Sequence, residues 1–297
     1  ASSRGPFPAW TSWTRRRGKS PGREGRVPLP FVLTRPASPP AGRSAAPLVL
    51  FQHDLGGDRR DAFVLADALA VEGWATIAID LPGHGGRGVC LGDGDCEAGT
   101  CAAGACAGGS LRVDGDGRPA NARDTLVPVA RPFAAGDSFR QHAVDLVTVV
   151  RSLRAADGPA SLAGVNIDPS DISFWGVGLG AAAGTIFLAV DPSVHVAVMT
   201  APAGNLGELV ARSTAFGGAM EAWLSGDLGL ATDAEARRFF RYGWSWAADP
   251  GDGAVYTRHL TESPLPDPDG AGGPMLPRAM LVQVAGADTV VPFECQR

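Results

Sequence analysis

Residues 171–190 read DISFWGVGLGAAAGTIFLAV, and this stretch decides the fold. The run over 171–176 predicts a buried strand, and the small residues over 179–190 predict a helix that packs closely behind it. The turn that joins them reads GVGLG, with Gly178 at its centre. A sharp strand-to-helix turn flanked by glycines can expose a nucleophilic side chain at its centre, but here that position has no side chain.

Strands and helices alternate on both sides of this stretch. Helices are predicted over 59–72, where Gly73 provides a stop, and over 138–156, where Ser138 and Gln141 have the spacing of a capping box. Further strands are predicted over 30–34, 47–52, 75–80, 195–201 and 278–286. This order predicts an α/β fold, doubly wound around a mostly parallel sheet.

Length and charge bound the organisation of the chain. The 297 residues, 45% of them hydrophobic, are enough for one large α/β domain. Residues 1–26 hold seven basic residues and one acidic residue, so we expect a basic linker or tail there, with structure beginning near Val27 and a domain over 27–297. The formal net charge is −5, which leaves −11 outside that tail and argues against a nucleic-acid partner. No apolar run is long enough for a transmembrane segment.

A long insertion is expected over 83–134, and it is rich in Gly, Asp and Cys. Its four cysteines predict two local disulfides and an oxidising compartment. The four are Cys90, Cys96, Cys101 and Cys106. Zinc binding is the alternative, but the paired C-x-x-C motifs of zinc sites are missing, and His84 alone does not make up the missing ligands. Cys295 is expected to stay unpaired.

Metal and cofactor sites are not expected elsewhere either. The motif DGDG at 114–117 hints at calcium, but the acid that an EF-type loop requires further along is missing, which favours a polar turn.

Three motifs, taken in order, carry a family resemblance. They are FQHDLGGDR at 51–59, AIDLPGHG at 78–85, and the GVGLG turn followed by GTIFLAVDP at 184–192. Over about residues 27–292 the chain resembles the large extracellular bacterial lipases and esterases of the α/β-hydrolase superfamily. The resemblance implies a sheet of the α/β-hydrolase type, a helical cap over about 204–275, and a small-molecule ester or lipid as substrate. It also implies a secreted, cell-surface or periplasmic bacterial protein.

The same resemblance assigns roles to individual positions. The motif residues are His53, Gly176 and Gly180, the nucleophile position is Gly178, the oxyanion-hole donors are the backbone N–H groups of Leu55 and Leu179, and the triad acid is Asp288. A turn-forming aspartate is the alternative interpretation of Asp288.

The chain departs from this pattern in several places. Asp54 stands where a glycine is usual, Val177 replaces a polar residue or histidine, and Gly178 replaces serine. The triad order requires a histidine after the acid, yet none of the nine residues after Asp288 is a histidine. We therefore expect that the domain is incomplete at its C-terminal end. His142, on a predicted helix before the turn, is expected to be structural.

These observations predict a lipase- or carboxylesterase-like hydrolase lineage whose serine route is inactive as the sequence stands. The alternative is a non-catalytic hydrolase-fold protein that binds a lipid or a protein partner. A third route, through Asp80, Asp288 or a metal, has no constellation of ligands to support it.

Overall fold

The structure is a computed structural model that describes residues 2–8, 28–155, 166–268, 270 and 273–296. Its central sheet has seven strands in the order β1-β2-β4-β3-β7-β8-β9. Their bounds are β1 (Ser2–Pro8), β2 (Pro28–Thr34), β3 (Ala46–Gln52), β4 (Ala75–Ile79), β7 (Ile167–Val177), β8 (Val194–Thr200) and β9 (Ala279–Gln283). Pairing is parallel from β4 to β9, whereas β1 with β2 and β2 with β4 are antiparallel. The predicted α/β class with a mostly parallel sheet is confirmed.

Strand β1 lies within the segment for which we expected a linker. It pairs with β2 from Ser2 opposite Thr34 to Pro8 opposite Pro28. The rest of that segment, 9–27, lies outside the described residues. The division into a tail over 1–26 and a domain over 27–297 stays a prediction.

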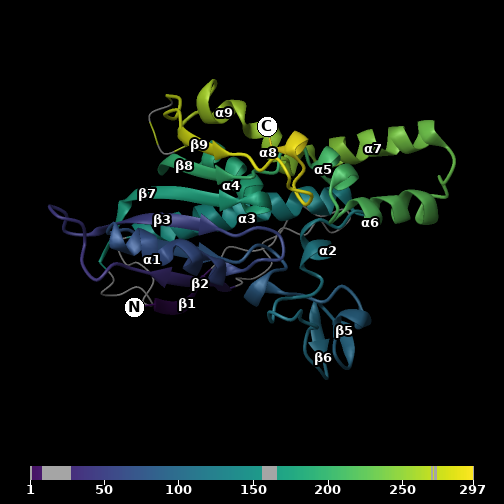
Figure 1. Cartoon of the computed structure of the whole chain (residues 1–297), viewed down its shortest axis with the longest axis horizontal. Helices are drawn as coiled ribbons and strands as arrows, with labels where there is room; N and C mark the ends of the chain where they lie inside the picture. Colours follow the sequence, from purple (N-terminus) through teal and green to yellow (C-terminus); the bar gives the residue numbers. More distant parts are fainter. Residues whose placement is uncertain (1, 9–27, 156–165, 269, 271–272, 297) are drawn as a thin grey trace.

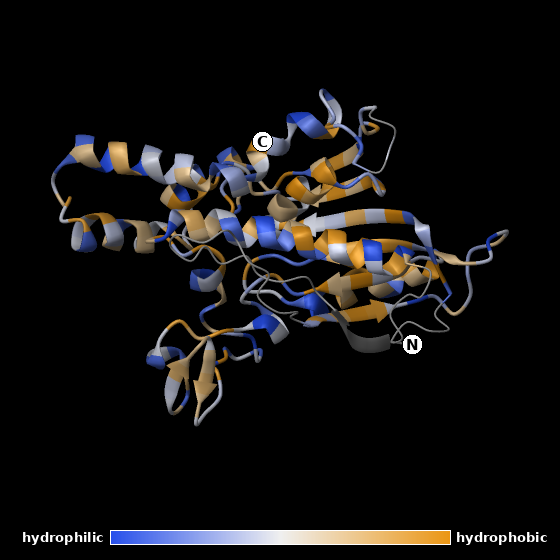
Figure 2. Cartoon of the chain, turned by 180° about the vertical axis from the view of Figure 1, so that it is seen from behind, coloured by the Kyte–Doolittle hydropathy of each residue, from blue (hydrophilic) through white to orange (hydrophobic). Residues whose placement is uncertain are grey.

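Both faces of the sheet are covered. Alternate side chains of a strand point to opposite faces, so Leu48 and Leu50 join the large core cluster while Phe51 joins a second cluster. Helix α1 (Phe63–Val71) covers the second cluster, and helices α3 (Pro132–Arg154) and α4 (Gly178–Val190) cover the first. Figures 1 and 2 show α1 and α3 on opposite faces.

The start of α3 corrects a prediction. The capping box at Ser138 and Gln141 predicted the first turn there, but α3 begins six residues earlier, at Pro132. Proline suits the first helical turn because its missing N–H would have no partner there. Ser138 lies inside the helix, where its hydroxyl donates to the carbonyl of Ala134 at 3.0 Å.

Further helices lie outside these two layers. They are α2 (Ala122–Leu126), α5 (Leu206–Arg212), α6 (Gly217–Ala222), α7 (Ala234–Ala248), α8 (Gly253–Tyr256) and α9 (Arg258–Thr261). Helices α5 to α9 lie in the region expected to form a cap, and α6 and α7 project from the body as a hairpin (Figure 1). Within the described residues, no helix has both the length and the apolar character needed to cross a membrane.

The insertion carries the two predicted disulfides, Cys90–Cys101 and Cys96–Cys106. They brace a small hairpin of β5 (Thr100–Ala102) and β6 (Ala105–Ala107), which also projects from the body (Figure 1). All four sulfur atoms are used in these two bonds. Asp114 accepts the N–H groups of Asp116 and Arg118, which makes 114–117 a polar turn. Cys295 is a free, buried thiol.

At one edge of the sheet, β9 leaves apolar side chains in solvent. Leu281 is 56% exposed and Val282 is 48% exposed. Strand β9 pairs with β8 on one side, in parallel register from Val196 opposite Ala279 to Thr200 opposite Gln283.

Breaking the disulfides should open the insertion without unfolding the sheet. Each bond closes a loop of 11 or 10 residues, for which chain entropy predicts about 3 kcal/mol of local stabilisation. We expect C101S/C106S to be cleaved by trypsin at Arg112 or Arg118 at least tenfold faster than the wild type, with a far smaller change in the far-UV melting curve. Equal cleavage rates for variant and wild type would contradict this prediction.

Candidate active site

The turn between β7 and α4 has the geometry of a strand-to-helix elbow. Gly178 has φ +52°, in the left-handed region that favours glycine. Positions 176 and 180, two residues away on each side, are glycines for a different reason, which is close packing. A Cβ at Gly176 would lie 2.7 Å from Cα of Ala181, and a Cβ at Gly180 would overlap the carbonyl oxygen of His53. The elbow therefore brings the loop after β3 directly against the first turn of α4.

Asp54, in that loop, occupies the space above Gly178. A Cβ at position 178 would overlap both Oδ1 and Cγ of Asp54. The backbone N–H of Leu179 donates to Oδ1 of the same carboxylate at 2.8 Å. The carboxylate thus takes the volume that a serine side chain at this position would need.

The environment of Asp54 opposes its negative charge. Burial raises the pKa of Asp54 to about 6, and the negative charge of Asp288 adds to the rise, while hydrogen bonding from the N–H groups of Leu179 and Leu55 acts in the opposite direction. These are the two N–H groups expected to hold a substrate oxyanion. The N–H of Leu179 bonds instead to a carboxylate of the chain itself. The sequence identified Asp54 as a departure, but carried no signal that its side chain would reach Leu179.

Asp288 lies in the loop after β9. Its Oδ1 accepts the N–H groups of Val290 at 2.8 Å and Val291 at 2.9 Å, so it shapes a turn. It is also near enough to Asp54 to raise the pKa of that carboxyl. The structure therefore brings Asp288 into the same region as Gly178, while its role as a triad acid stays a prediction.

Two histidines brace the loops around the elbow. His53 accepts the N–H of Leu81 through Nε2 at 3.0 Å, and His84 accepts the N–H of Gly56 through Nε2 at 3.2 Å. The Nδ1–H groups donate to the carbonyl oxygens of Asp54 and Pro82, respectively. Each ring comes from one loop and bonds the other, so the loops after β3 and β4 are cross-linked twice.

Both bracing rings are held neutral. Burial lowers the pKa of His53 and of His84 to about 4. With both nitrogens of each ring engaged, neither is available as a general base.

The remaining histidines lie elsewhere. His142 is buried in α3, where burial lowers its pKa, and neither of its ring nitrogens has a hydrogen-bond partner among the described residues. His195 lies 3.5 Å from Arg278, and His259 contacts the carbonyl oxygen of Ser263. Within the described part of the chain, no hydrogen bond joins any histidine to Asp288.

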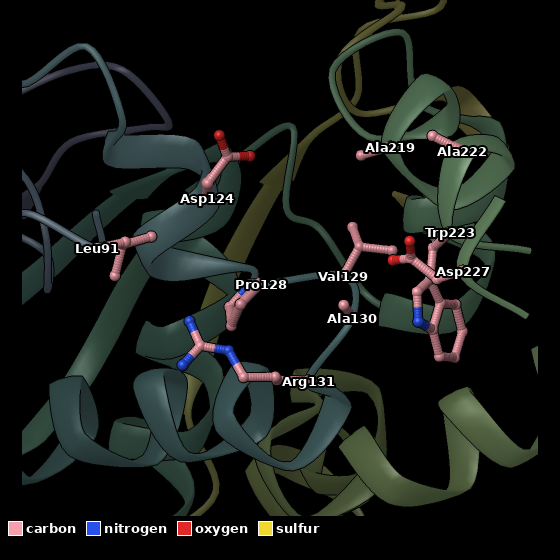
Figure 3. A pocket seen from close by; sticks show the side chains of 10 residues that line it. All are labelled: Leu91, Asp124, Pro128, Val129, Ala130, Arg131, Ala219, Ala222, Trp223 and Asp227. Atoms are coloured by element: carbon pink, nitrogen blue, oxygen red, sulfur yellow. The ribbon is translucent and has the colours of Figure 1, made fainter. Parts of the chain in front are cut away.

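A separate cavity of about 360 Å³ lies between the insertion and the cap. Its lining is Leu91, Asp124, Pro128, Val129, Ala130, Arg131, Ala219, Ala222, Trp223 and Asp227 (Figure 3). Among the aromatic residues of the segment 204–275, Trp223 lines this cavity and Trp244 is buried, with its Nε1 donating to the carbonyl of Val129. Phe239 and Trp246 are more than 70% exposed. The aromatic residues therefore divide between core packing, the cavity wall and solvent.

The fold is that of α/β hydrolases. The structure is similar to the acetyl xylan esterase of Paenibacillus sp. R4, with a TM-score of 0.51, 15% identity, and coverage of 91% of this chain and 67% of that protein. It is also similar to acetyl xylan esterase 1 of Thermoanaerobacterium sp. JW/SL YS485, with a TM-score of 0.51, 13% identity, and coverage of 98% and 76%. The sequence itself matches no protein-family model and no curated protein.

The bracing histidines predict a pH dependence of stability. Their pKa is about 4 in the folded chain and about 6.5 when unfolded, so their stabilising effect is present above pH 6.5 and is lost as pH falls towards 4. Over that window each histidine lowers the free energy of unfolding by up to about 1.4 kcal/mol per pH unit. Asp54 acts in the opposite direction. Because its pKa is raised in the folded chain, a fall in pH from 6 to 4 increases the contribution of Asp54 to the free energy of unfolding.

The variant H53Q/H84Q isolates the histidine effect, because glutamine can keep an acceptor near Nε2 but does not titrate. We expect urea unfolding of this variant to show a clearly smaller loss of stability from pH 6.5 to pH 4 than the wild type. Asp54 and His142 are the same in both proteins. Parallel pH profiles would show that the two rings do not act as neutral braces.

Proposed function

We propose that this chain has the α/β-hydrolase fold and derives from ester hydrolases, but that, as its sequence stands, it does not cleave esters through a serine nucleophile. The observation that carries the proposal is the carboxylate of Asp54 above Gly178. A serine route needs a nucleophile, a base and free oxyanion donors. Glycine at position 178 leaves no nucleophile, and the carboxylate of Asp54 occupies one oxyanion donor, the N–H of Leu179.

The substrate class proposed for the lineage is a small-molecule ester or a lipid. The resemblance of the three motifs to lipases and esterases supports it, and both similar structures are named as acetyl xylan esterases. In the same proposal, the insertion over 83–134 and the cap over about 204–275 belong to a hydrolase domain over 27–297. The two disulfides support a secreted or periplasmic location, because such bonds persist in oxidising compartments.

Non-catalytic binding is the second candidate function, with a lipid or a protein as the partner. The open pocket of about 360 Å³ between the insertion and the cap is the observation that favours it. Trp223, Pro128 and Val129 give it an apolar wall, and Arg131 and Asp227 add charges of opposite sign (Figure 3). This cavity does not include Gly178 or Asp54 in its lining, so binding there would not require the elbow.

Fluorophosphonate labelling with peptide mapping tests the proposal on the wild-type chain, because the reagent reports an activated serine without a guess at the substrate. We expect no labelled serine, and hydrolysis of p-nitrophenyl acetate about a millionfold below that of an intact serine esterase run in parallel. Circular dichroism establishes that the unlabelled protein is folded. A labelled serine in the folded protein would overturn the proposal.

A further inference from the structure

We propose that the four cysteines of the insertion bind one Zn²⁺ ion when they are reduced, and release it when they form the two disulfides. The ligands are the sulfur atoms of Cys90, Cys96, Cys101 and Cys106, which the disulfides bring together beside the hairpin of β5 and β6. This hairpin projects from the body of the protein (Figure 1), and the site does not depend on the proposed function.

The first argument is the distance between the sulfur atoms. The Sγ atoms of Cys90, Cys96 and Cys106 all lie within 4.8 Å of one another, although they belong to two different disulfides. The fourth, Sγ of Cys101, is bonded to that of Cys90. Zn²⁺ binds four thiolates as a tetrahedron with Zn–S bonds of about 2.3 Å, which places the sulfur atoms roughly 3.8 Å apart. The cluster is therefore already close to the size that the ion requires.

The second argument is the kind of ligand. Among the described residues, this is the group of three or more His, Cys, Asp or Glu side chains whose donor atoms come close enough to hold a metal ion, and its members are all cysteines. Sulfur ligands select Zn²⁺ over Ca²⁺ and Mg²⁺, which prefer oxygen. Cys90 and Cys96 are buried, so two of the ligands are shielded from water, as in closed structural zinc sites.

The third argument is that contacts other than the disulfides also bring the cysteines together. Cys101 and Cys106 face each other across β5 and β6. The N–H of Cys90 donates at 3.0 Å to the carbonyl of Gly104, in the turn between those strands. The N–H of Cys101 donates at 2.7 Å to Oδ1 of Asp93, in the segment that follows Cys90. These contacts do not involve sulfur, so they favour the same arrangement in the reduced chain.

The exchange between the two states balances. Each cysteine enters the chain as a thiol, and binding of Zn²⁺ by the four thiols releases their protons. Two equivalents of an external disulfide then accept the electrons and become four thiolates, while the protein thiolates form the two S–S bonds and the ion leaves. The disulfides leave no thiolate to bind a metal, so each state excludes the other.

Cobalt provides the test, because Co²⁺ held by four thiolates in a tetrahedron absorbs strongly in the near ultraviolet and in the red. The full chain is reduced with a phosphine under argon and titrated with Co²⁺. We expect both bands to saturate at one Co²⁺ per chain and to disappear when one equivalent of Zn²⁺ is added. The oxidised chain should show neither band.

Two variants separate the cluster from other thiols. C101S/C106S removes two ligands, and we expect it to lose the saturable bands. C295S is the matched control, because Cys295 is a free thiol outside the cluster, and it should titrate like the wild type.

Proteolysis gives an independent result without any substitution. Once the phosphine is removed, trypsin should cleave the reduced chain at Arg112 or Arg118 at least about tenfold more slowly in Zn²⁺ than in Mg²⁺, because the bound metal closes the insertion as the disulfides do. Cleavage of a small peptide in each buffer corrects for effects on trypsin, and circular dichroism monitors the sheet.

Any of four results would overturn the proposal. They are the absence of tetrahedral bands in the reduced wild type, equal titration of C101S/C106S and the wild type, bands that appear only when the sheet is unfolded, and cleavage that Zn²⁺ leaves unchanged.

Discussion

The close approach of the loop after β3 to the first turn of α4 constrains which residues fit at the elbow and where the side chain of Asp54 lies. The carbonyl of His53 lies where a side chain at position 180 would be, so only glycine fits there. This approach places Asp54 over Gly178 and lets its carboxylate accept the N–H of Leu179. The strand order puts β3 beside β7, so the contact also joins the two central strands to the helix that follows them. Loop, elbow and helix therefore act as one unit.

The bracing histidines give that unit its rigidity. His53 and His84 tie the loops after β3 and β4 through buried neutral rings. Neutral rings add no charge near Asp54, so they do not offset its unfavourable burial. The site thus combines two loops tied together by neutral histidines with one buried carboxylate, Asp54, that has no cationic partner among the described residues. Local packing alone does not explain this arrangement.

The sequence predicted the alternation of strands and helices well, because buried parallel strands are continuous apolar runs and α3 has clear helical periodicity. It missed the first turns of α3, since the Ser138 pattern resembles a cap while Pro132 makes the actual start. It predicted two disulfides but not their pairing, which depends on how β5 and β6 bring the cysteines together. At the site it identified Asp54 and Gly178 as separate departures. Their contact joins residues far apart in the chain, so no local pattern could reveal it.

The exposed edge of the sheet has a practical consequence for the purified protein. Within the described chain, β9 meets a neighbouring strand only on the β8 side, and Leu281 and Val282 lie in solvent. A flat edge with apolar side chains is a template for a further extended segment, and proteins usually protect such edges with charge, proline or a covering helix. Exposed apolar residues on such a strand favour pairing with a further extended segment. A lysine in place of Leu281 would add the kind of charge that usually protects a strand at this place.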